Sequence, residues 1–135
     1  MFNINNVKLI EFDAHASSMG SLYVYDTAHE FLFTIARVFV VDCHEDCTRG
    51  QHAHKACGQL LICLKGSCVI IVSDGKNKQE FFLATPNAGL FIPPTLWAEQ
   101  AYQNNTLLMV LSDQPFDEQD YIRDYEEYIR FRSSL

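Results

Sequence analysis

Two histidines placed two residues apart are the side chains of this sequence best suited to chemistry. His52 and His54 lie in the segment Arg49-Gly50-Gln51-His52-Ala53-His54, between a glycine-bearing turn and the apolar run 60–64. Side chains two apart on a β-strand point to the same face, so both imidazoles would share one cavity if that face lines a barrel. Imidazoles bind metal ions and also transfer protons near neutral pH. The pair alone leaves both uses open.

Strands must position this pair, because most of the chain consists of short apolar runs separated by turn residues. Asp74-Gly75, between two such runs, is the clearest hairpin signal. The expected strands cover residues 7–12, 21–25, 35–41, 60–65, 68–73, 79–83, 89–92 and 106–111. Many short strands without a long helical period predict a β-sandwich or barrel.

The C-terminal segment changes to a helical period. Its apolar and aromatic residues recur at three- and four-residue intervals: Tyr121, Ile122, Tyr125, Tyr128 and Ile129. Asp117 has the position of an N-cap, with acidic residues following it. We expect one amphipathic α-helix from Asp117 onward, whose tyrosines pack on the sheet in preference to forming an aromatic ligand box.

The composition is that of one compact domain spanning residues 1–135. Acidic residues outnumber basic ones by 17 to 10, giving a formal charge of −7, so nucleic acid is not expected as a partner. No apolar run approaches the length of a membrane helix, and residues 1–10 lack signal-peptide features. We therefore expect a cytoplasmic protein without membrane contact, whose five cysteines are free thiols.

The spacing around the histidine pair resembles the metal-binding pattern of the cupin superfamily, small β-barrels related to jelly rolls. His52 and His54 match the first two ligands, and Gly66 matches the closing glycine. Gln59 stands where metal-binding cupins carry a glutamate, and Ala98 stands where they carry a third histidine. A divalent metal site needs at least three protein ligands, normally with a carboxylate among them. We therefore expect no metal and no cofactor, and favour proton transfer over the reading as a metal-dependent cupin dioxygenase.

A closer resemblance covers nearly the whole chain. The segments that carry it are Arg37-Val38-Phe39, Arg49-Gly50-Gln51-His52-Ala53-His54-Lys55, Leu64-Lys65-Gly66-Ser67-Cys68, Gly89-Leu90-Phe91-Ile92-Pro93-Pro94 with Trp97, and Tyr121-Ile122-Arg123-Asp124-Tyr125. Together they resemble the dTDP-4-keto-6-deoxyglucose 3,4-ketoisomerases, the FdtA/WxcM-like sugar isomerases. The Arg-Gly-x-His-Ala-His-Lys segment and the Asp-Tyr-Ile-Arg-x-Tyr segment near the C-terminus are the most specific pieces.

This resemblance implies an all-β fold, a cupin double-stranded β-helix or jelly-roll barrel with one C-terminal α-helix. It implies a metal-independent enzyme that converts a dTDP-4-keto-6-deoxyhexose to its 3-keto isomer through an enediol, in biosynthesis of surface polysaccharide such as lipopolysaccharide O-antigen. It also implies a homodimer with exchanged N-terminal strands. The alternative is a non-catalytic cupin module that binds a nucleotide sugar.

The resemblance also suggests roles for individual residues. We expect His52 to take the C3 proton and His54 to shuttle protons to the enediol oxygen or to C4, and the sequence leaves the reverse assignment of base and acid open. Arginines would hold the diphosphate or sugar oxygens, and aromatic rings would form the pocket walls, with core packing as their competing role. The expected substrate-binding residues are Arg49, Arg37, Trp97, Phe39, Tyr23, Gln59 and Glu99. Departures from the family pattern at Met19 and Ala98 leave the C4 configuration of the product open.

Overall fold

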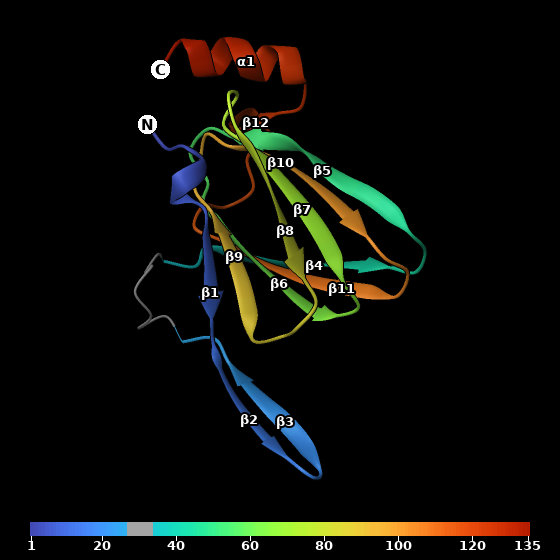
Figure 1. Cartoon of the computed structure of the whole chain (residues 1–135). Helices are drawn as coiled ribbons and strands as arrows, with labels where there is room; N and C mark the ends of the chain where they lie inside the picture. Colours follow the sequence, from blue (N-terminus) through green and yellow to red (C-terminus); the bar gives the residue numbers. More distant parts are fainter. Residues whose placement is uncertain (27–33) are drawn as a thin grey trace.

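Two five-stranded antiparallel sheets face each other in the computed structural model, which describes residues 1–26 and 34–135 (Figure 1). The first sheet has the order β1 (Lys8–Glu11), β9 (Ala88–Ile92), β6 (Gln59–Lys65), β11 (Thr106–Ser112) and β4 (Arg37–Cys43). The second has the order β12 (Tyr121–Ile122), β5 (Cys47–His54), β10 (Trp97–Tyr102), β7 (Cys68–Ser73) and β8 (Lys78–Leu83). This arrangement confirms the predicted all-β jelly roll with a C-terminal helix.

The main core lies between the two sheets, because alternate residues of each strand point inward. Leu61 on β6, Ile70 and Val72 on β7, and Leu108 on β11 are completely buried in it. The positions between them form the outer faces. Period-two burial therefore explains how apolar runs such as 68–73 form strands.

A short helix, α1 (Tyr125–Ser133), covers one end of the second sheet (Figure 1). Tyr128 is fully buried against Trp97, Ala53 and Ile122. Its hydroxyl donates hydrogen bonds to the carbonyl oxygens of Ser73 (3.1 Å) and Thr95 (2.8 Å). The helix thereby fixes the end of the barrel at which β5 and β10 meet.

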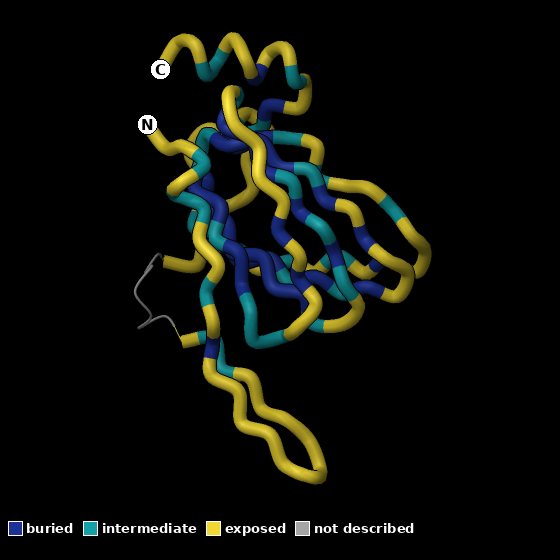
Figure 2. Tube along the Cα trace, in the orientation of Figure 1, coloured by how far each residue is buried: buried dark blue, intermediate teal, exposed yellow. Residues whose placement is uncertain are grey.

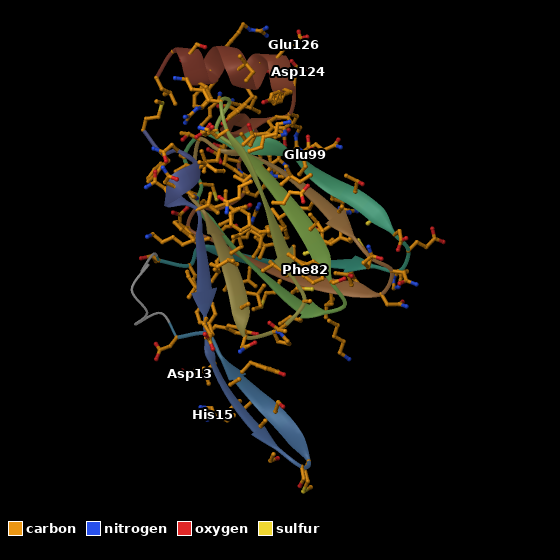
Figure 3. The ribbon with its side chains drawn as sticks, in the orientation of Figure 1. Asp13, His15, Phe82, Glu99, Asp124 and Glu126 are labelled. Carbon is orange, nitrogen blue, oxygen red and sulfur yellow. The ribbon has the colours of Figure 1, made fainter. Side chains whose placement is uncertain are left out.

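A two-stranded hairpin, β2 (Asp13–Ser17) and β3 (Gly20–Val24), projects away from both sheets (Figure 1). Nearly all of its residues are exposed, as Figure 2 shows. Asp13 and His15, labelled in Figure 3, lie on this projection. The hairpin has no packing partner within the described part of its own chain beyond its base, where Phe12 contacts Tyr25.

The predicted start of the C-terminal helix is wrong. Asp117 does act as an N-cap, but it caps a 3₁₀ helix, η2 (Glu118–Asp120), which is followed by β12. The α-helix begins eight residues later, at Tyr125, where the Asp124 side chain accepts a hydrogen bond from the Glu127 backbone. Tyr121 is therefore a strand residue, paired with His54, because this pairing prevails over the helical spacing.

The eight expected strands all have counterparts, although bounds differ by up to two residues. Four strands were not expected: β2, β5, β10 and β12. A further 3₁₀ helix, η1 (Ile4–Asn6), precedes β1. Within the described residues, the five cysteines are free and no helix is long and apolar enough to cross a membrane.

Candidate active site

The two histidines project from the last residues of β5 to the same side. Their ring centroids lie 4.8 Å apart with the ring planes nearly perpendicular. His54 is buried and His52 is half-buried. One strand thus holds two imidazoles close enough to act on one small group.

A β-bulge at Gly50 sets the position of this strand against β10. The pairing register between β5 and β10 shifts between Ala98 and Gln100, opposite His52 and Arg49. Gly50 has φ +70°, and a Cβ there would lie 2.9 Å from the side chain of Gln100. Glycine is therefore required both for the backbone conformation and for the close approach of Gln100.

The histidines line a small cavity of about 10 Å³, which is room for about one water-sized group. Gln59 and Ala98 line the same cavity, as the cupin pattern predicts for those positions. Gln59 is buried and donates a hydrogen bond to the Ser112 hydroxyl at 3.2 Å. The remaining lining residues are Cys57, Ile92, Pro93, Leu96 and Gln100.

Asp120, at the end of η2, forms a partly buried pair with His54. Its Oδ2 lies 2.8 Å from Nδ1 of His54, and its Oδ1 accepts the Ala56 backbone N–H at 2.7 Å. Its carbonyl oxygen accepts the Lys55 N–H at 2.9 Å. Two contacts therefore hold this carboxylate beside the imidazole, and a third holds the backbone of Asp120.

Tyr121 covers the histidine pair from β12. Its ring centroid lies 5.1 Å from that of His52 and 4.4 Å from that of His54. Its hydroxyl accepts a hydrogen bond from Arg37 at 3.3 Å. The guanidinium of Arg123 lies over the same ring, 4.2 Å from the centroid, and pairs with Glu118 at 2.8 Å.

Arg37 and Phe39 lie together on β4 at the edge of this group. The guanidinium carbon of Arg37 is 4.7 Å from the Phe39 ring centroid and 5.4 Å from that of Phe116. Phe116 is exposed and also packs on Tyr121, with centroids 5.7 Å apart. These contacts hold a half-buried cation between two aromatic rings at the site.

Burial keeps both imidazoles neutral. Desolvation, followed by the nearby His54 and Arg123, lowers the pKa of His52 to about 4. Burial also lowers the pKa of His54, against an opposing contribution from its hydrogen bond to Asp120. Both side chains can therefore accept a proton at pH 7.

Metal-ligand side chains near the site are few. Within the described residues, only His54, Cys57 and Asp120 bring three such groups within 4.8 Å of one another. Both oxygens of Asp120 already bond His54 and Ala56. The cupin ligand positions themselves hold two imidazoles, a glutamine and an alanine, which do not fit a facial metal site.

Of the seven expected substrate-binding residues, only Gln59 lines the cavity. Arg37 and Phe39 belong to the group around Tyr121, and the other four lie elsewhere. Arg49 is exposed and is close enough to Cys43 and Tyr102 to interact electrostatically with them. Tyr23 lies on the projecting hairpin.

Trp97 and Glu99 occupy the opposite face of β10 from the residues that line the cavity. Trp97 is buried under α1, 5.2 Å from the Tyr125 ring centroid. Its indole N–H donates to Glu99 at 3.2 Å (Glu99 is labelled in Figure 3). Trp97 therefore packs in the core, which is the alternative to the substrate-binding role expected from the sequence.

Comparison with known proteins places this geometry in a family. Residues 5–133 match the FdtA family model, described as WxcM-like, C-terminal. The TDP-4-oxo-6-deoxy-alpha-D-glucose-3,4-oxoisomerase of Aneurinibacillus thermoaerophilus is 37% identical over 130 residues, covering 95% of this chain and 94% of that protein.

Solved structures agree with the family match. QdtA, a sugar 3,4-ketoisomerase from Thermoanaerobacterium thermosaccharolyticum solved in complex with TDP, is 35% identical with a TM-score of 0.88, covering 97% of each chain. The rmlC epimerase of Mycobacterium tuberculosis, only 16% identical, has a TM-score of 0.78 over 90% of this chain and 70% of that one. The latter shows a shared fold alone.

Three site residues were not expected from the sequence. Asp120 and Tyr121 belong to the specific Asp-Tyr-Ile-Arg segment, but the helical spacing predicts a helix there with the tyrosine packed in the core. Phe116 precedes the apparent N-cap and has no periodic partner. The sequence signal for Asp120 and Tyr121 is the Asp-Tyr-Ile-Arg segment itself, because its similarity to the family is more specific than the packing of a helix requires.

Proposed function

The chain belongs to the FdtA family and is a sugar-nucleotide 3,4-ketoisomerase, and we propose that it isomerises a dTDP-linked 4-keto-6-deoxyhexose without a metal. The observation that carries the proposal is the pair His52 and His54, 4.8 Å apart beside one cavity. The positions of the other two cupin ligands, Gln59 and Ala98, supply no anionic or imidazole group.

The two histidines divide the proton transfers. His52 removes the proton from C3, and the electron pair of that bond forms the C3–C4 double bond of an enediol as the C4 oxygen gains a proton. The C3 hydroxyl then loses its proton, C4 gains one, and the ketone stands at C3. His54 carries protons between the oxygens and C4. Neutral imidazoles suit this reaction because each can accept a proton and return it.

Charged and aromatic groups outside the cavity bind the substrate. The cavity holds only about one water-sized group, so the sugar ring lies at its mouth with the reacting edge toward His52. Arg37 polarises a sugar oxygen or holds the diphosphate, and Phe39 with Phe116 forms an aromatic wall. Arg49, Tyr23, Trp97 and Glu99 stay predicted binding residues that lie outside this group.

We propose that the chain forms a homodimer. An isolated two-stranded hairpin is marginally stable in water, so β2 and β3 need a surface to pack on. Val38 and Val40, on the outer face of the edge strand β4, are 53% and 52% exposed. A second copy that receives the hairpin and covers this face would satisfy both needs, in line with the exchanged N-terminal strands expected from the family.

The proposed substrate suggests a metabolic role and a location in the cell. We propose that the product enters amino-sugar synthesis for surface polysaccharide, and the cytoplasmic location stays a prediction. A non-catalytic sugar-nucleotide module is the competing function. It would bind the same ligand and give no turnover.

Paired measurements on histidine variants test the proposed roles. His52→Asn and His54→Asn should each lose turnover of dTDP-4-keto-6-deoxyglucose while the affinity for TDP changes little, because groups acting in the transition state contribute little to ground-state binding. His44→Asn, in the connection between β4 and β5, is the matched control, because the His44 side chain is 82% exposed. Full turnover in both site variants would contradict the proposal.

A further inference from the structure

The imidazole of His54 is held by one nitrogen only. Nδ1 lies 2.8 Å from Asp120, whereas Nε2 is buried and has no hydrogen-bond partner among the described residues. A carboxylate only accepts hydrogen bonds, so the proton of a neutral His54 must sit on Nδ1. Nε2 then carries the lone pair, on a ring that lines the cavity beside His52.

We propose that Asp120 is a positioning residue that holds His54 as the Nδ1–H tautomer, so that the unprotonated Nε2 can accept a substrate proton. The inference rests on the proposed isomerase function for its kinetic consequence, but not for the tautomer itself. It assigns a role to a residue outside the two-histidine motif. A histidine held in this way cannot rotate its protonated nitrogen into the cavity without breaking the pair.

The surroundings of Asp120 make this role specific. Oδ1 is committed to the Ala56 N–H at 2.7 Å, and the carbonyl oxygen of Asp120 is committed to the Lys55 N–H at 2.9 Å. The adjacent residue, Tyr121, pairs with His54 in the β12–β5 ladder. The carboxylate therefore cannot turn, and Oδ2 must face the imidazole.

These contacts predict what an amide would do in the same place. In Asp120→Asn, the Ala56 N–H needs the carbonyl oxygen of the amide, so the NH₂ group faces His54. An NH₂ group donates, so Nδ1 of His54 must become the acceptor and its proton must move to Nε2. The variant would keep the shape of the site and present the wrong nitrogen to the substrate.

The chain offers a matched control at Asp113. Its Oδ1 accepts the Gly58 N–H at 2.8 Å and its backbone N–H donates to the Gly58 carbonyl at 3.2 Å. Asp113 thus anchors the same loop, residues 55–58, as Asp120 does. Among the hydrogen bonds of the described residues, its side chain makes none to a histidine. Asp113→Asn reports the cost of losing a loop-anchoring carboxylate without a tautomer change.

The experiment is a long-range ¹H–¹⁵N spectrum of the full chain, which distinguishes the two neutral imidazole tautomers. We expect Nδ1–H for His54 in the native protein and in Asp113→Asn, and Nε2–H in Asp120→Asn. Turnover of Asp120→Asn should fall on the order of 100- to 10,000-fold with its KM changed only slightly, while Asp113→Asn stays close to native.

Two results would overturn the inference. One is an Nε2–H tautomer of His54 in the native protein, which can be read even if Asp120→Asn does not fold. The other is equal loss of turnover in Asp120→Asn and Asp113→Asn. The spectrum is taken without substrate, so a chain that failed to isomerise the proposed sugar would still show whether Asp120 sets the tautomer.

Discussion

The half-buried environment of His52 predicts a measurable dependence of stability on pH. Its pKa falls from 6.5 to about 4 because burial, with His54 and Arg123 nearby, penalises the charged ring. The unfolded chain therefore binds this proton more tightly than the folded protein does. The free energy of unfolding should fall as pH decreases from 6.5 to about 4, and this contribution should be constant above 6.5.

The size of the effect follows from the same two values. A tenfold change in proton affinity is worth about 1.4 kcal/mol, so the full loss is roughly 3 kcal/mol. Urea unfolding at several pH values would measure it. The His52→Asn variant should lack this part of the pH dependence, whereas His44→Asn, whose side chain is 82% exposed between β4 and β5, should follow the native curve.

The low pKa of His52 also determines how far activity persists as the pH falls. With a pKa of about 4, roughly 97% of His52 is neutral at pH 5.5, compared with about 9% for an ordinary histidine. NMR titration of the His52 ring gives the pKa directly. A midpoint at or above 6.5, or a stability curve unchanged by His52→Asn, would refute the reasoning.

Three further substitutions test the scaffold and the assembly. Gly50→Ala should destabilise the protein by about 1–3 kcal/mol in chemical unfolding, because its φ of +70° and the nearby Gln100 leave no room for a methyl group, whereas Gly20→Ala meets nothing within 4 Å and should not. Tyr128→Phe should cost about 1–3 kcal/mol in the same assay, because the buried Ser73 carbonyl loses this donor and the Thr95 carbonyl keeps the longer hydrogen bond from Arg132, at 3.4 Å. Val40→Asp should convert a dimer to a monomer in sedimentation velocity. The control is Phe82→Asp, on the exposed face of β8 in the other sheet (Phe82 is labelled in Figure 3). A dimer that persists in Val40→Asp would contradict the proposed interface.

The histidine pair and the two missing ligands could be read from the sequence because both depend on local spacing. His52 and His54 share a face through the two-residue period of a strand, and the spacing to Gln59 and Ala98 is carried by the cupin pattern. The strand β10 was missed because alanine, glutamate and glutamine at its centre have weak strand propensity. Its burial comes from packing that a single sequence does not display.

The part of the site that depends on β12 could not be predicted for a different physical reason. Asp117 carries a true capping signal, and that signal serves a 3₁₀ helix of three residues as well as it would serve an α-helix. The two strand residues that follow are fixed by pairing with β5, a contact across more than sixty positions of the chain. Asp120 and Tyr121 reach His54 only through that pairing.

Solvent exchange during turnover tests the central claim most directly. Purified protein would be incubated with dTDP-4-keto-6-deoxyglucose in deuterated water, and C3 and C4 of the sugar would be followed by proton NMR. Proton transfer through an enediol predicts a 3-keto product with deuterium at C4, and the coupling pattern gives the C4 configuration. Absence of both the 3-keto sugar and exchange at either carbon would contradict the isomerase account for this substrate.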